Sequence, residues 1–120
     1  MKLKVGIDII EIDRFKFFLE DEERLKKHFT TNEILYFNKF SEKLSHISGC
    51  FCAKEAFAKA LKVGFGKQLS PIDIEVLHDK NGAVYINSTL PKIKNLLNGQ
   101  KVEINISHSK TASTAICLIF

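Results

Sequence analysis

The chain has 120 residues, of which 45% are hydrophobic and 27% charged, so it can bury one core and is too short for two ordinary domains. Its formal charge of +4 and pI of about 9.0 favour an anionic partner without distinguishing nucleic acid, phosphate-bearing cofactors and acidic proteins. No segment approaches the roughly 20 apolar residues of a membrane span, and the N-terminus lacks a signal-peptide pattern. We therefore expect one cytoplasmic domain, residues 1–120, with no membrane span.

The first predicted element is a strand over residues 2–12. Apolar residues flank Asp8 in the sequence VGIDII, which predicts a strand packed on both faces. An aspartate in such a strand must be hydrogen-bonded or must hold a cation. Asp8 is the first candidate functional residue, although capping of a neighbouring backbone group would also explain it.

Helical segments are expected next, over residues 13–29 and from the sequence TTNE at 30–33 onward, where Thr30 or Thr31 is a suitable cap. The first of these segments carries Arg14 and Arg24 together with the acidic run EDEE. This mixture of charges fits a solvated helix pair at least as well as a docking surface.

The sequence CFCAKEAFAKALK at 50–62 predicts a helix that is apolar on two faces. At about 100° per residue, Glu55 lies in the middle of a stripe that also contains Ile47 and Phe51. A carboxylate shielded in this way needs a cation, a proton or several donors. An ion pair with Lys59, one turn later, is the simplest structural explanation.

The second half of the chain predicts a hairpin, a short helix and two final strands. These elements are hairpin strands at 73–79 and 83–87 around an Asn-Gly turn, a helix capped by Ser88 with Pro91 in its first turn and Asn98-Gly99 at its end, and strands at 101–107 and 113–120. The order of elements predicts an α+β fold with a largely antiparallel sheet packed against the long buried helix.

His108 is the third polar residue in an apolar pattern. Apolar residues alternate on one face of the strand at 101–107, and His108 continues that face at the end of the strand. A hydrogen-bonded core histidine would explain it without any function. The cysteines Cys50 and Cys52 lie about 200° apart on a helix, so they can neither bridge each other nor chelate one metal ion, and we expect packed, reduced thiols.

Considered together, Asp8 and Glu55 indicate a metal site rather than two separate structural roles. Two carboxylates without a Cys/His ligand cluster are a hard-oxygen pair of the kind that holds Mg²⁺, an ion that completes its shell with water and substrate phosphates. The pair therefore predicts a phosphate-bearing substrate.

The residues beside Glu55 fit such a substrate. Lys59 and Lys62 lie on or near the Glu55 face of the helix, and Gly64 and Gly66 follow in the sequence VGFG. A glycine-rich dinucleotide-binding motif would follow a strand, whereas this sequence follows a helix. We therefore interpret VGFG as a sequence that ends the helix and also lets the backbone approach a diphosphate.

Four segments resemble, in chain order, the signatures of the holo-acyl-carrier-protein synthases, the small 4'-phosphopantetheinyl transferases. They are GIDIIEIDR at 6–14, FCAKEAFAKAL at 51–61, GFGKQLS at 64–70 and ISHSKTASTA at 106–115. The resemblance spans nearly the whole chain. It implies an enzyme of fatty acid biosynthesis that transfers 4'-phosphopantetheine from coenzyme A to a serine of apo-acyl carrier protein and releases adenosine 3',5'-bisphosphate.

The same resemblance implies roles for the candidate residues. Asp8 and Glu55 would bind Mg²⁺, and the residues in contact with coenzyme A would be Lys59, Lys62, Gly64, Gly66, His108 and Ser109, with Lys59 also catalytic. The group that accepts the serine proton stays open between a water on the metal and one of the carboxylates. Arg14 and Arg24 would meet the acidic carrier protein, and family members are typically homotrimers with active sites at subunit interfaces.

The chain departs from the family pattern at two places. Cys50 stands where the family often has an arginine suited to a coenzyme phosphate, and Ala83 and Val84 stand where a proline is common. The first departure bears on coenzyme affinity, and it raises the question whether Lys54 or a neighbouring chain supplies the missing charge.

Two other classes of function compete with this interpretation. A non-catalytic basic module that binds nucleic acid would explain the pI, but two Tyr and no Trp leave few stacking platforms, and the class leaves Asp8 and Glu55 unexplained, so we expect no nucleic-acid partner. A structural protein with a polar core would explain the carboxylates but not the glycine-rich turn beside the lysines.

Overall fold

The structure, a computed structural model of the protein, describes residues 2–120. Its elements in chain order are β1 (Lys4–Glu11), the 3-10 helix η1 (Ile12–Phe15), α1 (Phe17–Glu20), α2 (Glu22–His28), α3 (Thr31–Phe37), α4 (Lys43–Leu61), the 3-10 helix η2 (Pro71–Asp73), β2 (Val76–His78), β3 (Val84–Ile86), α5 (Pro91–Leu97), β4 (Val102–His108) and β5 (Ala112–Ile119). None of the helices in this part of the chain is long and apolar enough to cross a membrane.

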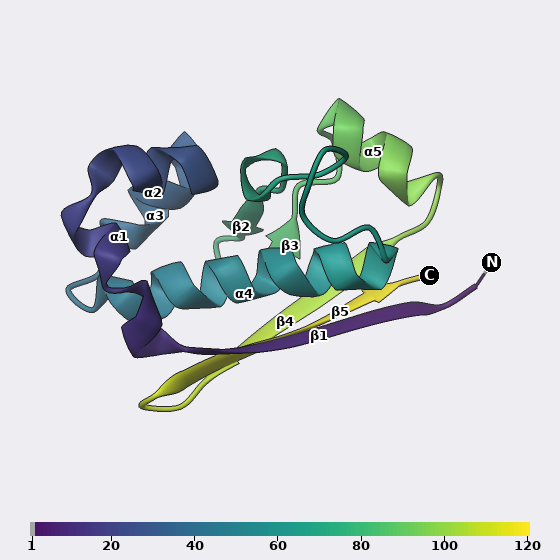
Figure 1. Cartoon of the computed structure of the whole chain (residues 1–120). Helices are drawn as coiled ribbons and strands as arrows, with labels where there is room; N and C mark the ends of the chain where they lie inside the picture. Colours follow the sequence, from purple (N-terminus) through teal and green to yellow (C-terminus); the bar gives the residue numbers. More distant parts are fainter. Residues whose placement is uncertain (1) are drawn as a thin grey trace.

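The long helix α4 lies across an antiparallel sheet with the strand order β1-β5-β4 (Figure 1). The helices α1 to α3 gather near the N-terminal end of α4, and α5 lies on the side of α4 away from the sheet (Figure 1). The β2-β3 pair lies beside the sheet, where β3 contacts β4. The predicted α+β fold, with a largely antiparallel sheet against a long buried helix, is confirmed.

Small residues let β1 approach α4 closely. Ala56 and Ala60 are fully buried, and a Cβ atom on Gly6 would lie 1.9 Å from the Ala56 carbonyl oxygen and 2.6 Å from the Ala60 nitrogen. Only glycine fits at this crossing, because no backbone atom can swing aside as a side chain can. The crossing brings Asp8, two residues further along β1, next to the middle of α4.

The ends of the helices follow local sequence in most places. Thr30 caps α3 in a capping box with Glu33, as expected, and α4 ends where Lys62 takes a left-handed conformation with φ of 62°. The prediction that Ser88 caps α5 is wrong. The N-cap is Leu90, because the Asn87 side chain accepts hydrogen bonds from the Thr89 amide and hydroxyl and forms a turn before the helix begins.

Two further expectations need correction. The helix expected over 13–29 is divided into η1, α1 and α2, and Asp21 caps α2 by accepting a hydrogen bond from the Arg24 amide. The expectation that β1 packs on both faces is wrong for the single chain. β1 is an edge strand, and Val5, Ile7 and Ile9 on its outer face are 49%, 62% and 71% exposed.

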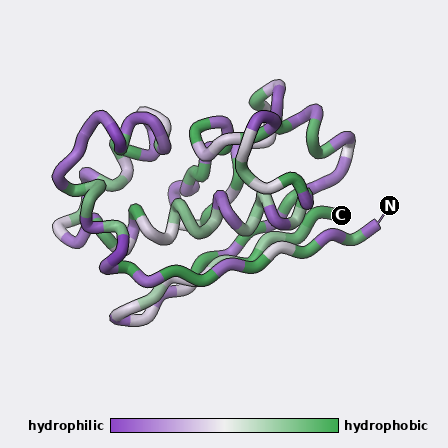
Figure 2. The backbone as a smooth tube through the Cα atoms, viewed as in Figure 1, coloured by the Kyte–Doolittle hydropathy of each residue, from purple (hydrophilic) through white to green (hydrophobic). Residues whose placement is uncertain are grey.

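The exposed residues of β1 belong to a larger apolar face. Strand register places Ile7 beside Ile116 of β5, which is 42% exposed, so the apolar surface continues across the sheet on the side away from α4. In Figure 2 hydrophobic stretches alternate with polar ones along these strands, and no other element of the described chain lies on the side of the sheet away from α4. The three cysteines, by contrast, are buried free thiols, as predicted.

Candidate functional site

Asp8 points from β1 toward α4 and is held there by several donors. Its Oδ1 accepts a hydrogen bond from Lys59 Nζ at 2.8 Å, and its Oδ2 lies 3.6 Å from Cys52 Sγ. The Thr114 hydroxyl donates to the Asp8 backbone carbonyl at 2.9 Å. The Asp8 side chain is 12% exposed and Lys59 is 53% exposed, so the pair sits at the edge of the core and is open to solvent on the lysine side.

Glu55 lies beside Asp8 on the exposed edge of α4. Partial burial raises the pKa of Glu55, and the negative charge of Asp8 raises it further, while Lys59 opposes both effects. Among residues 2–120 no ion pair joins Glu55 to Lys59, because the lysine turns to Asp8 instead. The simplest explanation for Glu55, a pair with Lys59 on its own helix, is therefore wrong.

The two carboxylates fit a hard divalent cation. Partial burial and, after it, the negative charge of Asp8 raise the pKa of Glu55, and a cation between the two carboxylates would offset both effects. Within the described residues, no group of three or more His, Cys, Asp or Glu side chains is arranged to hold a metal. A cation here would take two protein ligands and fill its remaining positions with water and substrate oxygens, which is the pattern of Mg²⁺ sites.

The turn after α4 carries the other predicted diphosphate contacts. Lys62 is exposed, and Gly64 has a φ of 63°, a left-handed conformation that favours glycine. A Cβ atom on Gly64 or Gly66 would meet nothing within 4 Å, so the backbone of this turn is open to a ligand. No hydrogen bond or ion pair in the described chain joins Lys62 to Asp8 or Glu55.

His108 and Ser109 lie at the opposite edge of the sheet. His108 Nδ1 is 2.8 Å from Ser113 Oγ, which is in turn 2.9 Å from Ser48 Oγ. The Ser109 hydroxyl accepts hydrogen bonds from the backbone amides of Thr111 and Ala112 and so shapes the β4-β5 turn. His108 is exposed at the surface rather than being a core histidine.

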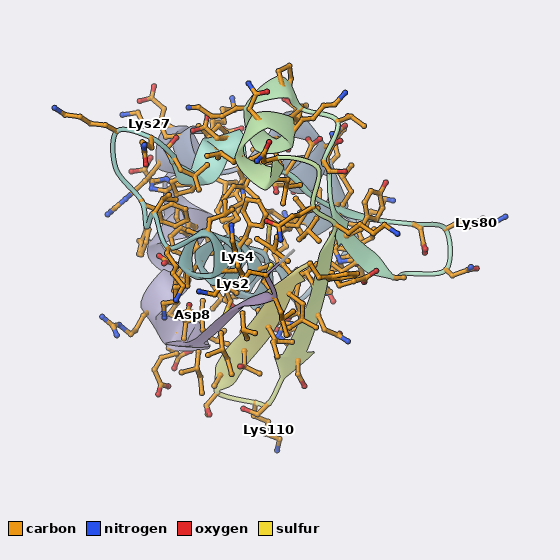
Figure 3. All side chains as sticks on the ribbon, turned by 90° about the vertical axis from the view of Figure 1, so that its right-hand side faces the viewer. Lys2, Lys4, Asp8, Lys27, Lys80 and Lys110 are labelled. Atoms are coloured by element: carbon orange, nitrogen blue, oxygen red, sulfur yellow. The ribbon has the colours of Figure 1, made fainter. Side chains whose placement is uncertain are left out.

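The predicted site residues thus form two groups on opposite sides of α4. Since β5 separates β1 from β4, the two strands are about 10 Å apart. Figure 3 shows Asp8 on one side of α4 and Lys80, at the tip of the β2-β3 hairpin, on the other. The structure brings Asp8, Glu55 and Lys59 together but does not bring His108 or Ser109 to them.

A cavity of about 250 Å³ lies beside His108. It is lined by two histidines that the sequence interpretation missed, His46 from α4 and His78 from β2, and by Cys50. His46, Gly49 and Cys50 share one helical face, and this spacing was a signal that could have drawn attention to them. Helical rotation places this face away from Glu55, because nine positions at about 100° per residue leave His46 half a turn from Glu55.

Lys54 does not supply charge to this cavity. Its ammonium group is fully buried and donates to Glu33 Oε1 at 2.7 Å and to the carbonyl oxygens of His28 and Pro71 at 2.8 and 2.9 Å. All three of its protons are used. Cys50 Sγ lies 3.4 Å from Glu33 Oε2, and burial, followed by the charge of Glu33, raises the pKa of this thiol well above its usual value.

The basic candidates Arg14 and Arg24 lie in the exposed N-terminal helices. Arg14 lines a surface groove of about 400 Å³ with Ile9 and Phe17, and the Arg24 guanidinium stacks 4.1 Å from the centre of the Phe17 ring. Part of the acidic run is engaged locally, since Asp21 caps α2 and Glu22 pairs with Lys26 at 3.6 Å.

Comparison with known proteins identifies the group to which this arrangement belongs. The sequence profile of the 4'-phosphopantetheinyl transferase superfamily matches residues 4–118. The holo-[acyl-carrier-protein] synthase of Finegoldia magna is 35% identical over 120 residues, which cover 99% of this chain and 97% of that protein. The enzyme of the same name from Clostridium tetani is 40% identical over 123 residues, which cover 99% and 96% of the two chains.

Solved structures agree with the sequence relatives. The holo-[acyl-carrier-protein] synthase of Helicobacter pylori in complex with coenzyme A superposes with a TM-score of 0.86 at 31% identity, covering 97% of this chain and 99% of that one. The Bacillus anthracis enzyme, in complex with CoA (3',5'-ADP), gives 0.81 at 31% identity and covers 97% and 94%. This chain belongs to the 4'-phosphopantetheinyl transferase superfamily, among the holo-[acyl-carrier-protein] synthases.

Proposed function

We propose that this chain transfers 4'-phosphopantetheine from coenzyme A to a serine hydroxyl of apo-acyl carrier protein. The serine oxygen bonds to the β-phosphorus of the coenzyme, the bond from that phosphorus to the bridging oxygen breaks, and adenosine 3',5'-bisphosphate leaves. The observation that carries the proposal is the contact of Asp8, Glu55 and Lys59 at the β1-α4 crossing, in a chain of this superfamily.

Asp8 and Glu55 are the residues that would hold Mg²⁺. The ion would offset negative charge on the diphosphate during the transfer. Two features of the chain support this assignment. Gly6 fixes the close crossing that sets the two carboxylates side by side, and the pKa of Glu55 is raised, first by partial burial and further by the negative charge of Asp8. Asp8 is further oriented by Cys52 and Thr114 through its carboxylate and backbone oxygens.

Lys59 supplies a second positive charge at the same place. Its ammonium group neutralises Asp8 at 2.8 Å and is 53% exposed, so it can reach a diphosphate bound on the solvent side. Lys62 and the open turn at Gly64 and Gly66 lie one turn further along and would contact the same diphosphate.

We infer that the enzyme works as a homotrimer whose active sites lie between subunits. Two observations support this. The apolar outer face of the sheet, with Ile7 and Ile9, is exposed in the single chain, and a face of this kind is typical of an interface. In addition, Asp8 and Glu55 lie on the opposite side of α4 from His108 and Ser109 in the single chain. One coenzyme molecule would contact both groups most readily if His108 of the partner subunit lies next to Asp8.

The remaining assignments concern partners and location. Arg14 and Arg24 are exposed beside the apolar groove at Phe17 and would dock an acidic carrier protein, which speeds encounter. The three free, buried thiols fit the reducing cytoplasm. Because the core contains residues from the first strand to the last, we also infer that the chain forms one domain.

The test is the mass of the carrier protein after incubation with the enzyme, coenzyme A and Mg²⁺. The proposal predicts a gain of one phosphopantetheine group per carrier and release of adenosine 3',5'-bisphosphate, both abolished by a chelator or by replacing the acceptor serine with alanine. Folded enzyme that leaves the carrier mass unchanged under these conditions would overturn the proposal.

A further inference from the structure

The Asp8 carboxylate lies against two side chains of α4 that stand two helical turns apart. Lys59 Nζ is 2.8 Å from Asp8 Oδ1, and Cys52 Sγ is 3.6 Å from Asp8 Oδ2. Seven positions at about 100° per residue return to nearly the same side of a helix, and Glu55 lies between the two positions along that side. The two donors therefore bracket Asp8 at the level of the second carboxylate.

Cys52 is the donor that serves Oδ2. Within residues 2–120 no other group donates a hydrogen bond to this oxygen. The Asp8 side chain is only 12% exposed, so water would compensate poorly for a lost donor. Cys52 is itself fully buried, and the packed core therefore holds its sulfur in place.

The single thiol proton of Cys52 has three acceptors within reach. Besides Oδ2 they are the Asp8 carbonyl oxygen at 3.3 Å and the Ser113 carbonyl oxygen at 3.6 Å. The Asp8 carbonyl oxygen already accepts a hydrogen bond from the Thr114 hydroxyl at 2.9 Å. Because a charged acceptor forms the stronger bond, the carboxylate is the favoured partner of the thiol proton.

The sulfur of Cys52 approaches Asp8 as a neutral thiol. Burial, followed by the charge of Asp8 and the hydrogen bond to it, raises the pKa of Cys52 to about 12. The thiol therefore acts as a donor to the carboxylate and not as a second anion beside it. Cys117 on β5 is equally buried, but burial is what raises its pKa to about 12, without a contribution from Asp8.

The contact with Cys52 matters most when a diphosphate is bound. Lys59 is 53% exposed, and the proposed function directs its ammonium group toward the diphosphate, which weakens its hold on Oδ1. Cys52 cannot turn away in the same manner, because its sulfur is enclosed between α4, β1 and β5. Of the two donors to the carboxylate, Cys52 is the fixed one.

We propose that Cys52 is a positioning residue of the metal centre: its thiol holds the Asp8 carboxylate toward Glu55, and the affinity for the divalent cation depends on this contact. The inference rests on the proposed function, since it takes Asp8 and Glu55 as the residues that bind the cation. Removing a group that hydrogen-bonds to a metal ligand typically costs about 10- to 100-fold in metal affinity or activity. A thiol is a weak donor, so we expect an effect at the lower end of this range.

The experiment measures Mn²⁺ binding to the full chain by electron paramagnetic resonance, with and without coenzyme A. Mn²⁺ favours the same oxygen ligands as Mg²⁺, and the signal of the free ion reports its concentration. Cys52→Ala removes the donor and should weaken Mn²⁺ binding by about tenfold in both conditions. Cys52→Ser keeps a donor, and Cys117→Ala removes a buried thiol opposite Gly6 on the same strand pair, so each should stay within about twofold of wild type.

Three outcomes with folded variants would overturn the inference. They are wild-type Mn²⁺ affinity in Cys52→Ala, an equal loss in Cys52→Ser, and an equal loss in Cys117→Ala, which would make general repacking of the core the cause. A measurement without substitutions covers the case in which Cys52→Ala does not fold. One of the infrared S–H stretching bands of the three wild-type thiols should shift when Mg²⁺ and coenzyme A bind, and unchanged bands would also overturn the inference.

Failure of this inference can be told apart from failure of the proposed function. If the wild-type protein modifies carrier protein while its Mn²⁺ affinity is insensitive to Cys52, only the role of Cys52 is wrong. If the folded wild-type protein modifies no carrier protein in the presence of Mg²⁺ and coenzyme A, the proposed function itself fails.

Discussion

The substitution Gly6→Ala tests whether the close crossing of β1 and α4 sets the geometry of the carboxylate pair. The new Cβ atom would lie 1.9 Å from the Ala56 carbonyl oxygen, whereas ordinary contacts begin at 3.4 Å. To restore an ordinary contact distance, β1 and α4 must separate locally by about 1.5 Å. Both contacting atoms are backbone, so the strand and helix themselves must move.

The displacement has consequences for stability and for chemistry. Forcing extra atoms into a packed core costs about 1–3 kcal/mol, and the backbone contact puts Gly6→Ala at or above the upper end of that range. Asp8 moves with the strand while Glu55 stays on the helix. A misplacement of about 1 Å at a reacting centre can lower a rate by about 100-fold, so we expect a loss of that order in carrier modification.

The assay compares urea unfolding with the rate of carrier modification as Mg²⁺ is varied, at a temperature where both proteins are folded. Gly66→Ala serves as the stability control, because a Cβ atom there meets nothing within 4 Å, and it should change the free energy of unfolding by no more than about 0.5 kcal/mol. Gly6→Ala should require more Mg²⁺ and turn over more slowly. Wild-type unfolding and wild-type Mg²⁺ dependence in this variant would refute the reasoning.

Three further predictions concern the core, the docking surface and the sheet face. Glu33→Gln should lower the free energy of unfolding in urea by about 3–5 kcal/mol, because it leaves the buried Lys54 ammonium without its charge partner; a change below about 1 kcal/mol would contradict this. Arg14→Ala should raise the KM for carrier protein, leave the KM for coenzyme A nearly unchanged and weaken the salt dependence of the rate. Equal effects on the KM values of both substrates would show that Arg14 does not belong to the docking surface. Ile7→Asp should give folded monomers by light scattering and reduce transfer, and an oligomer of unchanged mass would count against the sheet face as the interface.

Features that depend on nearby residues were predictable from the sequence. The capping box at Thr30 and Glu33 spans three positions, and the sequence VGFG at 63–66 indicated that α4 ends near Lys62. The stripe containing Glu55 predicted a partly shielded carboxylate, and the structure confirms partial burial with a raised pKa. In each case the physical cause lies within one or two helical turns.

Features set by distant residues were not predictable in the same way. Glu33 and Lys54 are 21 positions apart, and their buried ion pair joins two helices whose packing no local pattern specifies. Lys59 had a nearby carboxylate in Glu55 but instead contacts Asp8, 51 positions away, because the Gly6 crossing brings β1 close. Both pairs are consequences of tertiary packing.

The outer face of β1 illustrates a third kind of limit. The apolar residues around Asp8 indicated a strand covered on both faces, yet Ile7 and Ile9 are exposed in the single chain. Hydrophobic sequence reports that a face favours burial but not whether the same chain or another copy covers it. The sequence pattern and the exposed face agree if the sheet is covered by other subunits.

The most direct measurement is the rate of carrier modification by Asp8→Asn and Glu55→Gln at saturating Mg²⁺ and coenzyme A. Both substitutions preserve side-chain shape and remove one negative charge, so the fold should persist, and unfolding curves check this. The account predicts that each variant loses nearly all transfer activity while remaining folded. Near-normal turnover by either variant would contradict the assignment of Asp8 and Glu55 as the metal-binding centre of the reaction.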